Sequence, residues 1–227
     1  KLAPLDCAAR GAELQRRSFC RMKKPTLFIV FLTVFIDVVG FSIIFPLFPA
    51  MLDHYLTMDG RDSLIGSLVA WLEQFAGDDK NAVATLFGGI LGSLYGILQF
   101  VFAPIWGAYS DKHGRRPTLV FTLSGIVFAN FIWMFAGSFA LLIFGRALAG
   151  IMAGNISTAS AVAADITSDK NRASGMIIIG VALGLGFILG PALGGGLAWL
   201  GHGVPMFFAA GLALINCIWA AFALVEP

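Results

Sequence analysis

Residues 107–117, GAYSDKHGRRP, place a dense group of charges between two long apolar runs. The upstream run reads LFGGILGSLYGILQFVFAPIW, and the downstream run reads TLVFTLSGIVFANFIWMFAG. Glycine and proline bound the stretch, as is typical of turns. The role of such a turn depends on whether water or lipid surrounds the apolar runs. Its titratable members are Asp111, Lys112, His113, Arg115 and Arg116.

The composition of the chain is that of a membrane protein. Of its 227 residues, 58% are hydrophobic and 12% are charged, whereas a soluble domain carries about 25% charged residues. The 27 Gly and 21 Phe suit close helix packing and lipid-facing aromatic side chains. The net charge of +2 is spread over short basic clusters, so no nucleic acid partner is expected. The sequence therefore predicts a lipid bilayer as the surrounding partner.

The apolar runs are long and continuous, which predicts membrane-spanning helices rather than the alternating strands of a β-barrel. A helix needs about 20 apolar residues to cross the hydrocarbon core. We expect an all-α transmembrane domain over residues 25–227 and a disordered or extraneous cytoplasmic tail over residues 1–24. The expected spans are 26–51, 83–107, 117–136, 139–163, 174–200 and 205–225.

The placement of Lys and Arg predicts the orientation of the chain. Basic residues gather in the tail, in the stretch 107–117 and between the fourth and fifth spans, while the loop 52–82 holds only Arg61 and Lys80. Because basic loops stay on the cytoplasmic side, both termini are expected there. The stretch 107–117 then becomes a cytoplasmic turn. A topology signal alone would explain its basic residues but not Asp111.

The loop 52–82 contains SLIGSLVAWLEQFAG, in which apolar residues recur at helical spacing. This pattern predicts a short amphipathic helix at the outer membrane interface. Two functions stay open for it: packing against the helix ends, or a lid or partner surface. The three histidines, His54, His113 and His202, are expected in loops.

No pattern in the sequence points to an enzyme. Cys7, Cys20 and Cys217 share no metal-ligand or disulfide spacing, and no P-loop or Ser-His-Asp arrangement is evident. We therefore expect neither a catalytic residue, nor a metal ion, nor a cofactor.

GAYSDKHGRRP resembles the signature G-x-L-[AS]-D-[RK]-x-G-R-[RK] of the major facilitator superfamily, which joins the second and third helices of that family. Only Tyr109 departs, where the family has Leu. GFILGPALGG, residues 186–195, resembles the glycine- and proline-containing element of the antiporter branches. FIDVVGFSIIFPLFP, residues 35–49, and AADITSDKNRASG, residues 163–175, are similar to parts of tetracycline efflux carriers.

The resemblance implies one six-helix half, a 3+3 inverted repeat, with a C-terminal six-helix half expected as its partner. It implies a secondary transporter with a small-molecule solute and protons as ligands, most simply a drug:proton antiporter. Two alternatives stay open: an organic-anion facilitator or symporter, and a non-transporting six-helix scaffold. Proteins of this family work by alternating access.

The resemblance also assigns functional residues. Charges at the cytoplasmic helix ends would form a gate network that favours one conformation. Its expected members are Gly107, Asp111, Gly114, Arg115, Arg116, Asp165 and Arg172. The fifth span would carry the antiporter helix motif, whose small residues allow close helix contact. That motif comprises Gly186, Gly190, Pro191, Gly194 and Gly195.

Two charges fall within the predicted spans, Asp37 near the middle of the first and Arg146 in the fourth. Such groups are costly in a bilayer, so we expect them to face a cavity that handles protons and substrate. The alternatives are a capping or packing role for Asp37 and carbonyl bonds for Arg146. Tetracycline carriers have an acid in the third helix, where this chain offers only Asn130. Polar neighbours expected in the same cavity are Gln99, Asn130 and Asn155.

Overall fold

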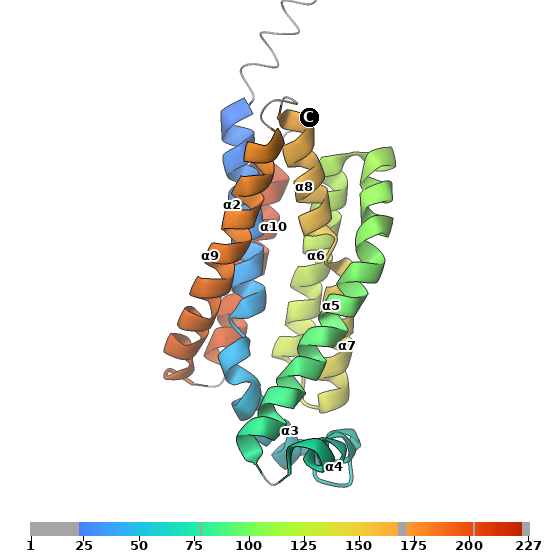
Figure 1. Cartoon of the computed structure of the whole chain (residues 1–227), viewed down its shortest axis with the longest axis vertical. Helices are drawn as coiled ribbons and strands as arrows, with labels where there is room; N and C mark the ends of the chain where they lie inside the picture. The colour runs from blue at the N-terminus through green and yellow to red at the C-terminus, as the bar shows by residue number, and fades with distance from the viewer. Residues whose placement is uncertain (1–22, 78, 168–171, 202, 224–227) are drawn as a thin grey trace, which may run out of the picture.

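The computed structural model describes residues 23–77, 79–167, 172–201 and 203–223, which form an all-helical bundle without strands (Figure 1). Of the expected tail, residues 1–22 lie outside this part, and Lys23 and Lys24 begin the first helix. The described elements are α2 (Lys23–Ser42), η1 (Phe45–Leu47), α3 (Phe48–Asp59), α4 (Leu64–Ala76), α5 (Lys80–His113), α6 (Arg115–Met134), α7 (Phe139–Met152), α8 (Asn155–Ile166), α9 (Arg172–Ala198) and α10 (Val204–Ala223).

Six helical units of the described chain are long and apolar enough to cross a membrane, which confirms the expected six-helix fold class. Figure 1 shows them running side by side along the long axis of the molecule. Each hides one side in the bundle and leaves much of its surface apolar and exposed, as lipid-facing helices do. The units are Leu27–Asp59, Lys80–His113, Arg115–Met134, Phe139–Ile166, Ala173–Ala198 and Val204–Ala223.

The first and fourth units are both interrupted, where the sequence predicted continuous spans. In the first, α2 ends at Ser42 and α3 begins at Phe48, because Pro46 and Pro49 cannot donate to the preceding turn. In the fourth, the helix breaks at Ala153 and Gly154 without any proline.

Contacts from α5 hold the break in the fourth unit. Trp106 Nε1 donates a hydrogen bond to the Ile151 carbonyl at 2.6 Å, and Gln99 Nε2 donates to the Ala153 carbonyl at 3.4 Å. A Cβ on Gly154 would overlap the side chain of Trp106. These bonds satisfy carbonyls that the broken helix leaves free inside the bundle.

The charged stretch differs from the expected turn. Helix α5 continues to His113 and α6 starts at Arg115, so Gly114 alone connects them. Gly114 has a φ of 99°, a conformation that favours glycine. Gly107 lies within α5 with nothing near a Cβ there, so the expectation of a tight turn at this residue is wrong. The loop placement is likewise wrong for His54, in α3, and for His113, while His202 lies outside the described residues.

The glycine-rich face of α9 packs closely on α2. A Cβ on Gly186 would meet Val38, one on Gly190 would overlap Ser42 Oγ, and one on Gly194 would overlap the Ile43 carbonyl. The Ser42 hydroxyl donates to the Gly186 carbonyl at 2.9 Å, which crosslinks the two helices. Pro191 lies inside α9, and Gly195 has no neighbour within contact distance of a Cβ.

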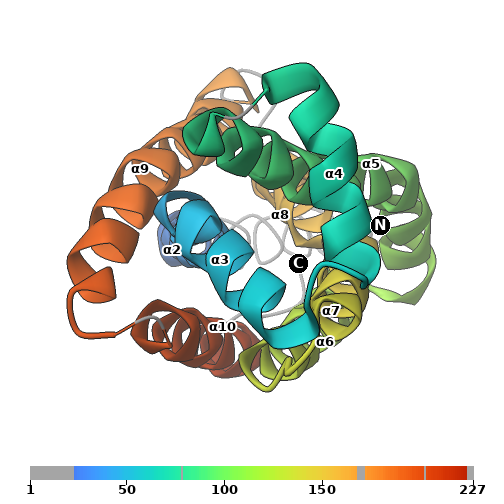
Figure 2. The same cartoon turned by 90° about the horizontal axis from the view of Figure 1, so that it is seen from below.

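Helix α4 lies across one end of the bundle, over α5 and near α3 and α7 (Figure 2). Its inner residues Ile65, Val69 and Leu72 are buried, whereas Trp71 and Phe75 are exposed. One apolar face therefore contacts the ends of the spans, and the outer face carries large apolar side chains as well.

Candidate functional site

The first cluster of candidate residues lies where α5, α6 and α8 end or begin, and Arg115 is its centre. The Arg115 guanidinium forms ion pairs with Asp111 at 2.6 Å and with Asp165 at 3.0 Å. It also donates to the buried Ser110 hydroxyl at 2.8 Å. We call Ser110, Asp111, Arg115 and Asp165 the Arg115 cluster. It ties three helix ends together through one side chain.

The carboxylates of the cluster are exposed to solvent, so little free energy is needed to separate its ion pairs. The side chains of Asp111 and Asp165 are 61% and 44% exposed, while that of Arg115 is 18% exposed. Ion pairs in water contribute about 0–1 kcal/mol each, and the same pairs strengthen when a partner surface excludes water. Such a cluster can therefore favour one conformation without holding the fold together.

The other expected gate residues take different places. Arg116 Nη2 donates to the Ala221 carbonyl at 2.6 Å and so binds the last turns of α10 to the start of α6. Arg172 begins α9, and its side chain lies outside the part that the structure describes. The Gly107 carbonyl accepts a hydrogen bond from the Ser110 hydroxyl at 2.8 Å, so Gly107 meets the Arg115 cluster through its backbone. The structure thus groups Asp111, Arg115 and Asp165 and leaves Arg116 in a capping contact.

The second site is a narrow central cavity of about 20 Å³, which we call the Asp37–Arg146 cavity. A water molecule needs about 10–15 Å³ of such volume, so this half alone encloses room for roughly one water. A larger solute would need a more open arrangement or a second half. Its lining includes Asp37 from α2, Tyr95 from α5, Asn130 from α6 and Arg146 from α7.

Arg146 is buried and has no counterion among the residues that the structure describes. Its side chain is 7% exposed, and its Nε and Nη2 atoms have no hydrogen-bond partner among the described residues. Its Cζ atom lies 4.3 Å from the centroid of the Trp133 ring, in a cation–π contact. Asp37 shares the cavity, but the described residues show no ion pair between them. The alternative of carbonyl bonds for Arg146 is not seen at Nε or Nη2.

The polar neighbours divide between the cavity and the helix break. Asn130 lines the cavity, whereas Gln99 bonds the Ala153 carbonyl at the break. Asn155, the first residue of α8, is 1% exposed and lies beside the Asp37 carboxyl group. Neither polar atom of its amide has a hydrogen-bond partner in the described part of the chain. Asn155 is not part of the cavity lining, so it lies next to the cavity with unused hydrogen-bonding capacity.

Sequence reasoning missed three residues of these sites. The Trp133 ring makes a cation–π contact with Arg146, and Tyr95 lines the cavity. The Ser110 hydroxyl accepts a hydrogen bond from Arg115. Trp133 and Tyr95 stand in apolar runs, where an aromatic residue is usually packing. The position of Ser110, directly before Asp111, was the one signal available. Only the folded chain brings each of them to its charged neighbour.

A bundle of six spans with an exposed apolar surface and charges turned to an inner cavity defines an integral multi-pass membrane protein. Residues 26–227 match the profile of the Major Facilitator Superfamily, and the chain belongs to this transporter family.

Curated relatives support the same branch that the motifs suggested. The human major facilitator superfamily domain-containing protein 10 is 39% identical over 201 residues, covering 83% of this chain and 43% of the relative. The class H tetracycline resistance protein of Pasteurella multocida is 32% identical over 189 residues, covering 83% and 41%. The predicted resemblance to the tetracycline-like branch is confirmed. The chain spans less than half the length of these relatives.

One solved structure, described as the human organic anion transporter MFSD10 (TETRAN), matches with a TM-score of 0.82 at 35% identity. The match covers 90% of this chain and 48% of that one. The six-helix bundle therefore has the fold of a transporter half.

Proposed function

We propose that this chain is one half of a secondary transporter that moves small organic anions together with a proton, through the Asp37–Arg146 cavity. The observation that supports this most is the buried Arg146 guanidinium, for which the described part of the chain offers no ion-pair partner. A buried unpaired cation is costly, and an anionic solute would supply the missing charge. The matched human transporter is named for organic anions.

Asp37 is the proposed proton carrier. It lies in the same cavity as Arg146 without pairing to it. An anion beside Arg146 would bring a second negative charge close to the Asp37 carboxylate, and like charges repel in a water-poor site. Anion and proton would therefore bind together. This charge relation favours symport over antiport for an anionic solute.

The Arg115 cluster is the proposed gate at the cytoplasmic end of the bundle. Its ion pairs join the ends of α5, α6 and α8, and they would strengthen when a second half covers them. A gate of this kind alternates with an outer closure, so that the cavity faces one side at a time.

A second candidate is proton-linked efflux of an amphiphilic drug, because tetracycline resistance proteins are 30–32% identical to the chain. The absence of an acidic residue in α6, with Asn130 in the cavity instead, weighs against tetracycline itself.

The two candidates differ in how they respond to a pH gradient. The protein that contains these residues is reconstituted in proteoliposomes, and uptake of benzenesulfonate, a permanently charged anion, is measured. Symport predicts faster uptake with acid outside and no pH response in Asp37→Asn. Acceleration by acid inside would support antiport, and the absence of uptake in either gradient would reject organic-anion transport.

A further inference from the structure

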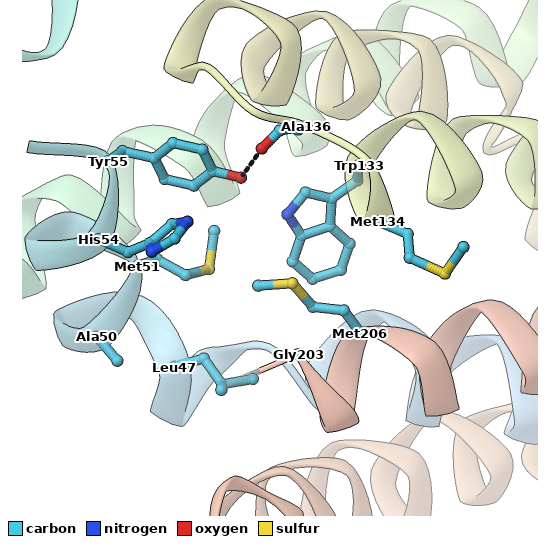
Figure 3. A pocket seen from close by; sticks show the side chains of 10 residues that line it. All are labelled: Leu47, Ala50, Met51, His54, Tyr55, Trp133, Met134, Ala136, Gly203 and Met206. Carbon is cyan, nitrogen blue, oxygen red and sulfur yellow. Dashed lines mark hydrogen bonds between the residues drawn. The ribbon is translucent and has the colours of Figure 1, made fainter. Parts of the chain in front are cut away.

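A second cavity, of about 180 Å³, lies at the opposite end of the bundle from the Arg115 cluster. Three segments enclose it: η1 and α3, the end of α6 with the turn that follows, and the start of α10 (Figure 3). The transport step proposed above does not use it. We call it the Trp133 pocket, after the lining residue whose ring also lies under the Arg146 guanidinium.

The Trp133 pocket contains a hydrogen-bond donor without an acceptor. Trp133 is 3% exposed, and its indole nitrogen has no partner among the residues that the structure describes. Figure 3 shows this nitrogen on the edge of the ring turned toward Tyr55. The Tyr55 hydroxyl donates a hydrogen bond to the Ala136 carbonyl at 3.2 Å. An acceptor atom between the two aromatic rings would therefore complete the indole bond.

The rest of the lining is mostly apolar and adaptable. Met51 and Met206 lie beside the indole in Figure 3, and their unbranched thioether side chains can change rotamer to admit a ligand. His54 is the one titratable side chain besides Tyr55 in the lining, which has no lysine or arginine. The chemistry suits a neutral ligand with one oxygen acceptor and an apolar body. Pockets that bind small molecules commonly combine these features.

The volume limits the size of such a ligand. An apolar cavity of about 150 Å³ accommodates one benzene molecule. At about 180 Å³, the Trp133 pocket would accept a single aromatic ring with a small oxygen-bearing substituent. A single water at the indole would use only part of this space.

We propose that the Trp133 pocket is a binding site for a small neutral aromatic amphiphile, whose oxygen accepts a hydrogen bond from the Trp133 indole. The ring of the ligand lies against Met51 and Met206. The same indole carries the Arg146 guanidinium at 4.3 Å. A ligand that fixes the orientation of the Trp133 ring would therefore also fix the aromatic surface on which the Arg146 guanidinium lies.

The test uses two ligands of nearly the same shape, acetophenone and α-methylstyrene, in which a CH₂ group replaces the carbonyl oxygen. The protein that contains these residues, with its Trp side chains labelled at the indole nitrogen, is studied by NMR in lipid nanodiscs. The Trp133→Phe variant identifies the Trp133 resonance. Acetophenone should move that resonance downfield in a saturable way. We expect α-methylstyrene to bind about threefold to tenfold more weakly and to cause no downfield shift.

Two results would overturn the proposal. One is the lack of a saturable acetophenone shift at Trp133, which would leave water as the occupant of the pocket. The other is an equal response to both ligands, or an equal response of the other indoles, which would indicate partition into lipid. Ala50→Phe, which fills the pocket from α3, should abolish the acetophenone shift. If that variant loses its spectrum, Met206→Phe serves the same purpose, and the comparison of the two ligands in the unmodified chain still decides.

Discussion

Arg146 lies over the indole ring of Trp133, its guanidinium carbon 4.3 Å from the ring centroid, although neither α6 nor α7 contains a carboxylate to pair with it. The nearest acid in the same cavity, Asp37, comes from α2 and forms no ion pair with it in the described chain. A cation held by an aromatic face and left unpaired is a position for an incoming anion. The function proposed for the chain rests on this relation.

Removal of the Arg146 charge should stabilise the fold. In Arg146→Met the side chain keeps its length, and the penalty for a buried unpaired charge disappears. The gain of about 1–4 kcal/mol is partly offset by the lost cation–π contact. We expect a higher thermal midpoint in detergent. Arg116→Met is the control, and it should lower the midpoint because it frees the Ala221 carbonyl. A lower midpoint for Arg146→Met would show that Arg146 supports the fold.

The Arg115 cluster should matter for transport far more than for stability. Asp111→Asn and Asp165→Asn each remove one exposed ion pair, worth less than about 1 kcal/mol, so the thermal midpoint should barely change. Uptake in proteoliposomes should nevertheless be lost, because the gate no longer closes. Lys112→Gln, on the same exposed turn, is the matched control and should transport normally. Unchanged uptake in Asp111→Asn would rule out a gate.

The contact between α2 and α9 predicts a sharp difference between two adjacent glycines. A Cβ at Gly194 would overlap the Ile43 carbonyl, whereas a Cβ at Gly195 meets nothing. Gly194→Ala should therefore destabilise the bundle by about 1–3 kcal/mol, and Gly195→Ala should be neutral or slightly stabilising. Thermal unfolding of the two variants, measured side by side, checks this. Equal midpoints would mean that the helices separate easily at this contact.

The break between α7 and α8 should depend on Trp106. Trp106→Phe removes the donor to the Ile151 carbonyl and leaves that acceptor unpaired inside the bundle, at a cost of about 1–3 kcal/mol. Trp199→Phe is the control, because Trp199 is 93% exposed. Hydrogen exchange should quicken around residues 151–155 in the first variant only. The same exchange rates in both would show that the break persists without the indole bond.

The sequence was sufficient for the six-span bundle and for the place of its charged stretch between the second and third spans, but not for the shape of that stretch. Long apolar runs specify six spans because the bilayer leaves no other way to satisfy the backbone. Asp111 lies four residues before Arg115, close enough to pair with it across Gly114. The sequence also led to Asp165, which comes from a distant helix, through the resemblance to a known family. Its role in a gate stays a prediction.

The helix break and the Trp133 contact could not be predicted. Ala153 and Gly154 are compatible with a helix, and the break depends on side chains of α5 that approach only in the folded bundle. Trp133 is one aromatic residue in an apolar run, and its position under Arg146 depends on how α6 and α7 pack. Both are tertiary effects without a local signal.

Direct binding of benzenesulfonate tests the central role of Arg146 most simply. Titration calorimetry on the protein that contains these residues should show binding of this anion and none of benzyltrimethylammonium, its cationic counterpart. Arg146→Gln should lower the affinity for benzenesulfonate by at least about 30-fold, the loss expected for a buried charge pair. Arg146→Lys should retain part of the affinity. Equal affinity of the unmodified protein and Arg146→Gln for benzenesulfonate would contradict an anion site at this arginine.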